Sequence, residues 1–129
     1  MKRLPNRPSS SPPPELQGQV HNSFEIDGIL TELGQMRYSP GGVPVLAARI
    51  EHRSRQMEAG VDREVGLELQ MIAVGDKAKS LALARLGSAA RVTGFLAAKS
   101  LRSRVPVLHI DTIEFLEGTN HGIQASNEA

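Results

Sequence analysis

Residues 43–54 alternate between apolar and charged side chains with the two-residue period of a β-strand. Leu46, Ala48, Ile50 and His52 fall on one face, and Ala47, Arg49, Glu51, Arg53 and Arg55 fall on the other. The pattern predicts a strand with one face on a core and one in solvent. Three arginines along roughly 20 Å of extended chain suit a row of phosphates, and a solvated strand face is the alternative interpretation.

The same alternation recurs along the chain and predicts the fold. It favours further strands at 24–30, 65–74, 91–99 and 107–115, separated by a turn at 39–42, a loop at 56–62 and a turn at 100–106. Between the third and fourth strands the period becomes helical, with Asp76 as the expected N-cap and Gly87 as the expected stop. Gly28 indicates a bend or a close backbone approach. We therefore expect a mainly β protein, a five-stranded OB-fold barrel with one short helix between strands 3 and 4.

The ends of the chain differ in composition from this domain. Residues 1–21 are rich in proline, serine and basic residues, which predicts a disordered tail, and residues 119–129 form a second polar tail. The OB-fold domain is expected at 22–118. There is no cysteine for disulfides or thiolate chemistry, and no apolar run is long enough to span a membrane, so a cytoplasmic protein is expected.

The net charge of +1 excludes binding of nucleic acid by bulk charge, so any binding must come from clustered cations. In an OB barrel the ligand crosses the second and third strands and the loops that join strands 1 to 2 and 4 to 5. Basic residues occur at those places, and we predict a DNA-binding set of Arg37, Tyr38, Arg49, Arg53, Arg55, Arg63, Lys99, Arg102 and Arg104. RNA remains open as the ligand, since phosphate contacts and stacking do not read the sugar.

Several motifs resemble primosomal replication protein N of bacteria. They are Glu-His-Arg-Ser at 51–54 followed by Glu-Ala-Gly at 58–60, Ser-Pro-Gly-Gly-Val-Pro at 39–44, Gly94-Phe95, and the ending from Leu108-His109 to Ile113-Glu114. The resemblance covers about residues 22–118. It implies a homodimer of OB-fold subunits that binds single-stranded DNA and assists the restart helicase and helicase-loading proteins. It also implies that Arg53 contacts DNA and that residues 1–20 precede the usual start.

The chain departs from that family in its aromatic residues. The family positions that carry stacking rings match Val61 and Gly66 here. Phe24 and Phe115 are expected in the core, Phe95 could face either way, and Tyr38 is a weak candidate for stacking. We therefore predict mainly electrostatic DNA binding, and an adaptor that binds chiefly proteins is the alternative function.

The sequence gives little support for catalysis. His52 and His109 lie on apolar strands, which favours core histidines with satisfied hydrogen bonds over a metal pair. Glu51 and Glu68 are expected to approach each other across strands and to balance arginines. We predict no enzyme activity, no cofactor and no metal.

Overall fold

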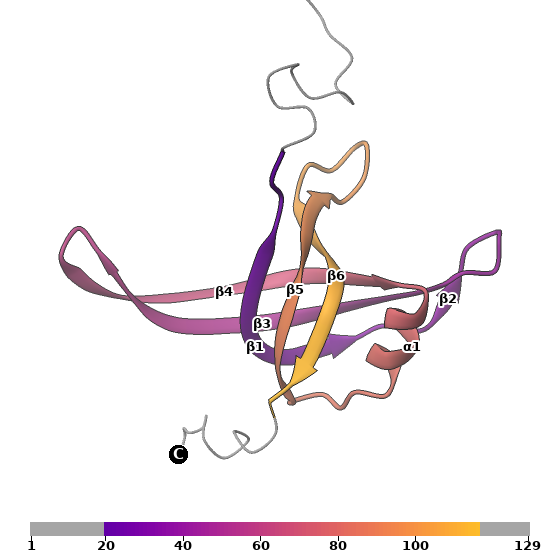
Figure 1. Cartoon of the computed structure of the whole chain (residues 1–129), viewed down its shortest axis with the longest axis horizontal. Coiled ribbons are helices and arrows are strands. Elements are labelled where there is room, and N and C mark those ends of the chain that lie inside the picture. The colour runs from indigo at the N-terminus through magenta and orange to yellow at the C-terminus, as the bar shows by residue number, and fades with distance from the viewer. Residues whose placement is uncertain (1–19, 117–129) are drawn as a thin grey trace, which may run out of the picture.

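Long alternating strands build the structure, a computed structural model that describes residues 20–116 (Figure 1). The strands are β1 (Phe24–Leu33), β2 (Arg37–Tyr38), β3 (Pro44–Glu58), β4 (Val61–Val74), β5 (Ala89–Ala98) and β6 (Pro106–Phe115). The one helix, α1 (Asp76–Ala82), lies between β4 and β5. The tails predicted at 1–21 and 119–129 lie outside the described residues, except for residues 20 and 21.

Strand pairing closes the sheet into a barrel. The order β1-β5-β6-β4-β3 returns to its start because β1 also pairs with β3. The pairing of β4 with β6 is parallel, and the other pairings are antiparallel. This confirms a mainly β barrel of the OB type. The helix follows the fourth strand of the chain rather than the third, because the short β2 forms an additional pairing at the edge of β3.

The inward residues of these strands form the core, as the alternation predicts. Leu30, Ile50, Met71, Val92 and Leu108 are fully buried inside the barrel. The helix contributes Ala78 and Leu81, which are both fully buried in the same core. Helix α1 therefore covers one end of the barrel and closes its interior from water.

The helix is shorter than the sequence predicts. Its N-cap is Gly75 rather than Asp76, no side chain caps it, and it ends at Ala82 instead of continuing to Gly87. Beyond the helix, the Gly87 N–H donates to the Leu30 carbonyl at 2.8 Å. This bond ties the segment to β1, so tertiary pairing replaces the last helical turn.

The loop predicted at 56–62 is a tight hairpin. Strands β3 and β4 stay paired as far as Glu58 and Val61, which leaves only Ala59 and Gly60 in the turn. Both have positive φ values, 53° and 80°, as two-residue hairpins with matching strand twist require. Figure 1 shows this hairpin extending well beyond the barrel.

Close backbone contacts explain two glycines. A Cβ at Gly28 would lie 2.7 Å from Ile50 Cγ1 and would overlap the Glu51 carbonyl, which confirms the predicted close approach. A Cβ at Gly94 would overlap the His109 carbonyl, at the point where the register of β5 and β6 shifts. Both positions require glycine for steric reasons.

Candidate nucleic-acid interface

The outward face of β3 and β4 carries arginines and carboxylates in alternation. Glu51 lies opposite Glu68, as predicted, and each carboxylate has an arginine partner. Arg53 Nη2 lies 3.2 Å from Glu51 Oε2. Arg49 lies between two acids, with Nη1 3.8 Å from Glu68 Oε1 and Nε 3.4 Å from Glu32 Oε1. This face is therefore close to neutral rather than uniformly cationic.

Two further predicted arginines lie on the projecting hairpin. Because the strands run further than predicted, Arg55 and Arg63 occupy paired strand positions. Arg55 donates from Nε and Nη2 to Asp62 Oδ2 at 3.1 and 2.9 Å, and Arg63 pairs with Glu58. Exposed pairs of this kind are worth only about 0–1 kcal/mol, so a phosphate can replace the carboxylate at small cost.

The loop between β5 and β6 carries cations of a different kind. Lys99, Arg102 and Arg104 form no ion pair with any residue between 20 and 116. The loop has its own hydrogen bonds: Lys99 N–H donates to the Val105 carbonyl at 2.9 Å, and Ser100 Oγ accepts from the Arg102 and Ser103 N–H groups. It therefore presents three uncompensated positive charges on an ordered turn.

One depression brings a strand arginine and a loop cation together. Arg49, Glu68 and Gln70 from the sheet and Lys99 from the loop line an open groove of about 370 Å³. The other predicted residues are more dispersed. Arg37 and Tyr38 lie in β2, with Tyr38 66% exposed, and Figure 1 places β2 and the tip of the β3–β4 hairpin at opposite ends of the long axis. The nine residues therefore do not line a single pocket.

A polar cluster around Asp27 was not predicted. Arg91 Nε and Nη2 donate to the two carboxylate oxygens of Asp27 at 2.8 and 2.9 Å, and Glu25 lies 3.9 Å from Arg91. The hydrogen bond from Arg91 is the main cause that holds the pKa of Asp27 below its ordinary 3.8, against the opposing effect of burial. The same bond raises the pKa of Arg91, so the pair stays ionised at neutral pH.

His52 has the satisfied hydrogen bonds that its strand position predicts, but it is partly exposed rather than part of the core. Nδ1 lies 2.7 Å from the Asp27 carbonyl and Nε2 lies 2.8 Å from Ser54 Oγ. Because a carbonyl only accepts, Nδ1 carries the proton in this contact. His52 is therefore a structural link between β1 and β3.

The aromatic residues differ from prediction at two places. His109 is not a core histidine: it is partly exposed and stacks on Phe95, with ring centroids 4.9 Å apart and an interplanar angle of 10°. Phe115 is 39% exposed rather than buried, because it lies near the end of the last strand. Phe24 packs against the core as expected.

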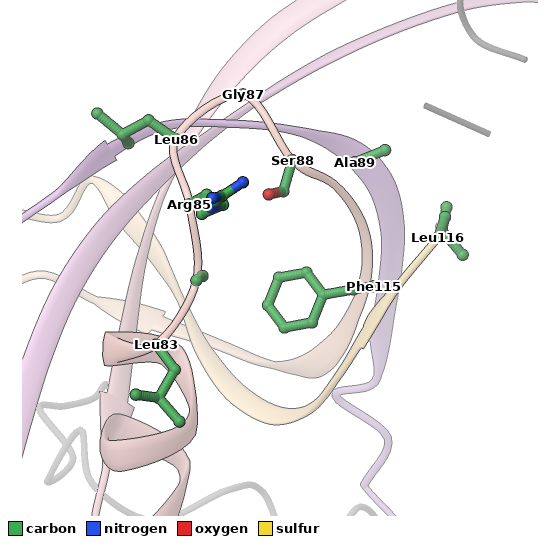
Figure 2. A pocket seen from close by; sticks show the side chains of 9 residues that line it. Leu83, Arg85, Leu86, Gly87, Ser88, Ala89, Phe115 and Leu116 are labelled. Atoms are coloured by element: carbon green, nitrogen blue, oxygen red, sulfur yellow. The ribbon is translucent and has the colours of Figure 1, made fainter. Parts of the chain in front are cut away.

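Phe115 belongs to an apolar pocket of about 400 Å³ that also includes Leu83, Arg85 and Ser88 (Figure 2). In Figure 2, Phe115, Arg85 and Ser88 point toward the cavity, whereas Leu86 points away from it. The pocket lies between the segment after α1 and the end of β6, and it includes none of the nine predicted residues.

Residues 20–116 contain no group of three or more metal-ligating side chains, and no helix among them is long and apolar enough to cross a membrane.

A closed OB-type barrel with exposed arginines on its outer strands, and with β5–β6 loop cations that form no ion pair within residues 20–116, has the features of single-strand-binding barrels. A family model described as "another single-strand binding protein family" matches residues 22–112. The chain belongs to this family. It also belongs with the replication restart proteins PriB, because it is 33% and 36% identical to two of them over about three quarters of its length.

The PriB protein of Nitrosomonas europaea is 33% identical over 100 residues, which cover 77% of this chain and 93% of that protein. The PriB protein of Bordetella pertussis is 36% identical over 98 residues, which cover 76% of this chain and 92% of that protein. Among solved structures, the priB protein of Ralstonia solanacearum has a TM-score of 0.68 at 29% identity and covers 75% of this chain and all of its own. The single-stranded DNA binding protein of Thermus aquaticus has a TM-score of 0.63 at 26% identity, and the match covers 78% of this chain and 52% of that protein.

Proposed function

We propose that the protein binds single-stranded DNA as an accessory of replication restart and performs no catalytic step. Membership of the PriB family and the barrel fold support this role. The observation that carries it is the loop between β5 and β6, where Lys99, Arg102 and Arg104 have no carboxylate partner within residues 20–116. Unpaired cations beside a groove attract phosphates without first breaking an ion pair.

The strand arginines extend this interface. A DNA strand lying along β3 would reach Arg49 and Arg53, where phosphates exchange with Glu68 and Glu51. The remaining predicted contacts, Arg37, Tyr38, Arg55 and Arg63, lie toward the two ends of the molecule. They would engage only a strand long enough to span β3, which has 15 residues at about 3.3 Å each.

Fluorescence anisotropy with labelled poly-dT tests the proposal. The double variant Arg102→Ala/Arg104→Ala should bind about tenfold more weakly at low salt, because two phosphate contacts are lost. The matched control is Lys79→Ala/Arg85→Ala, which removes two cations that also lack ion pairs among residues 20–116 but lie near the other end of the barrel. An equal loss in both variants would show that only total charge matters.

The adaptor function is the second candidate, because the four predicted arginines on β3 and β4 already have carboxylate partners. An adaptor would bind the restart helicase or helicase-loading proteins through its barrel. The variant Arg53→Ala distinguishes the two candidate functions. If the protein acts by binding DNA, the variant should form a weaker complex with poly-dT. If it acts as an adaptor, its DNA affinity should be unchanged and its helicase binding intact. Poly-U measured beside poly-dT distinguishes RNA from DNA.

A homodimer is part of the same proposal. In β1, residues 24–28 pair with β5 along one edge, and pairing with β3 begins only at Ile29. The other edge of this segment accepts no strand from residues 20–116, which supports pairing with a second copy. Sedimentation equilibrium should give twice the chain mass, and a monomer would contradict the dimer. We expect such a protein to act in the cytoplasm, where the chromosome is replicated.

A further inference from the structure

Phe95 and His109 form an exposed aromatic step on the outside of the barrel. Phe95 is 47% exposed although it lies in the middle of β5, and its ring stacks on the His109 ring from β6. A large apolar ring at such a position costs free energy in the unbound protein, since it stays in contact with water. The stacking on His109 holds the Phe95 ring in place, and the exposed part of the ring stays available to a ligand.

The strand register places this step beside the basic groove. His109 is paired with Ile72 of β4, and Ile72 is paired with Ala47 of β3, so these side chains form one row across the outer face. Arg49 and its partner Gln70 stand in the next row, two residues along the strands and roughly 7 Å away. Both line the groove that Lys99 borders.

The sequence of β5 leads from the ring to the cationic loop. Phe95, Ala97 and Lys99 alternate onto the same side, and Arg102 and Arg104 follow in the loop. The small side chain of Ala97 leaves space between the ring and the ammonium group. An aromatic plane beside a groove lined by phosphate-binding groups has the layout of a single-strand stacking platform.

We propose that Phe95, supported by His109, stacks a nucleobase while Arg49 and Lys99 bind the adjacent phosphates of the strand in the neighbouring groove. This inference rests on the proposed function and adds base stacking to the phosphate contacts proposed there. The chemical class of ligand is a single strand with unpaired bases.

The test compares two labelled oligomers of equal length, oligo-dT and an abasic oligomer with the same phosphate backbone. Phe95→Leu keeps an apolar side chain suited to a strand but has no ring. We expect it to lose about 5- to 100-fold in affinity for oligo-dT and nothing for the abasic oligomer. The matched control is Phe115→Leu, which removes an exposed ring from the pocket in Figure 2 and should change neither affinity.

A Phe95→Leu variant that binds oligo-dT like the wild type would overturn the proposal, and so would an equal loss on both oligomers. A wild-type protein that binds both oligomers equally would overturn it while leaving the proposed function intact. A wild-type protein that binds neither would overturn both.

A second measurement remains decisive if Phe95→Leu folds poorly. In the variant Tyr38→Phe/Phe95→Tyr the only tyrosine lies at position 95. Stacking predicts that oligo-dT quenches its fluorescence and that the abasic oligomer does not. Equal quenching by both, or none by either, would contradict the proposal.

Discussion

Asp27 links its own strand, β1, to both β3 and β5. Its carboxylate accepts two hydrogen bonds from Arg91 on β5, and its carbonyl is bonded by His52 on β3. Sequence alternation places Asp27 and Arg91 on outer faces but does not reveal that they face each other. That information depends on the β1–β5 register, which pairs these residues directly across 64 positions of sequence.

The Asp27–Arg91 pair should make stability depend on pH. Because the pKa of Asp27 is lower in the folded protein, its contribution is present above the ordinary value of 3.8 and is lost as pH falls through the folded value. Asp27→Asn should lower Tm by a few degrees at pH 7, and its difference from wild type should shrink at pH values below 3.8. The control Glu25→Gln, which alters a contact of 3.9 Å, should have a smaller effect. A difference that persists unchanged in acid would contradict this assignment.

At the scale of elements, the apolar alternation is enough to predict all five long strands. The ends of elements were less predictable, because they depend on partners distant in sequence. The helix stops at Ala82 since the following segment bonds to β1, and β3 continues to Glu58 since β4 stays in register with it. Neither partner is visible in a local pattern.

The covering role of α1 gives a stability prediction. Leu81 is fully buried, so Leu81→Ala should lower the free energy of unfolding by about 2–5 kcal/mol. Leu83→Ala is the matched control, because Leu83 is 85% exposed two residues later. Urea unfolding monitored by circular dichroism measures both. Equal effects would show that α1 does not form part of the core.

The β3–β4 turn gives a prediction for local stability. Ala59 has a φ of 53°, which costs a residue with a Cβ about 1 kcal/mol, and asparagine tolerates this conformation better. Ala59→Asn should increase hydrogen-exchange protection of amides in the hairpin and raise Tm by at most a few degrees. Ala59→Val should reduce that protection, because a β-branched side chain disfavours positive φ. Identical protection in the two variants would argue against the turn geometry.

At the scale of the whole molecule, acids and bases largely cancel, and their arrangement determines what the surface can bind. The sequence predicts which residues are cationic and that several occupy the outer side of β3. It also predicts that Glu51 and Glu68 balance arginines, but not that Arg55 and Arg63 each pair with a carboxylate, because those two pairs depend on the hairpin turn. The sequence also left open which face of the sheet carries Phe95. The structure places Phe95 on the outer face, where its ring stacks on His109.

The salt dependence of poly-dT affinity tests the central claim that phosphate contacts by the loop cations and Arg49 provide most of the binding. Four such contacts predict that the logarithm of affinity falls by about 3 per decade of salt, since each contributes about 0.7. The wild-type protein should lose about 50-fold in affinity between 50 and 200 mM salt, on this same estimate. An affinity that stays nearly constant over that range would contradict the account.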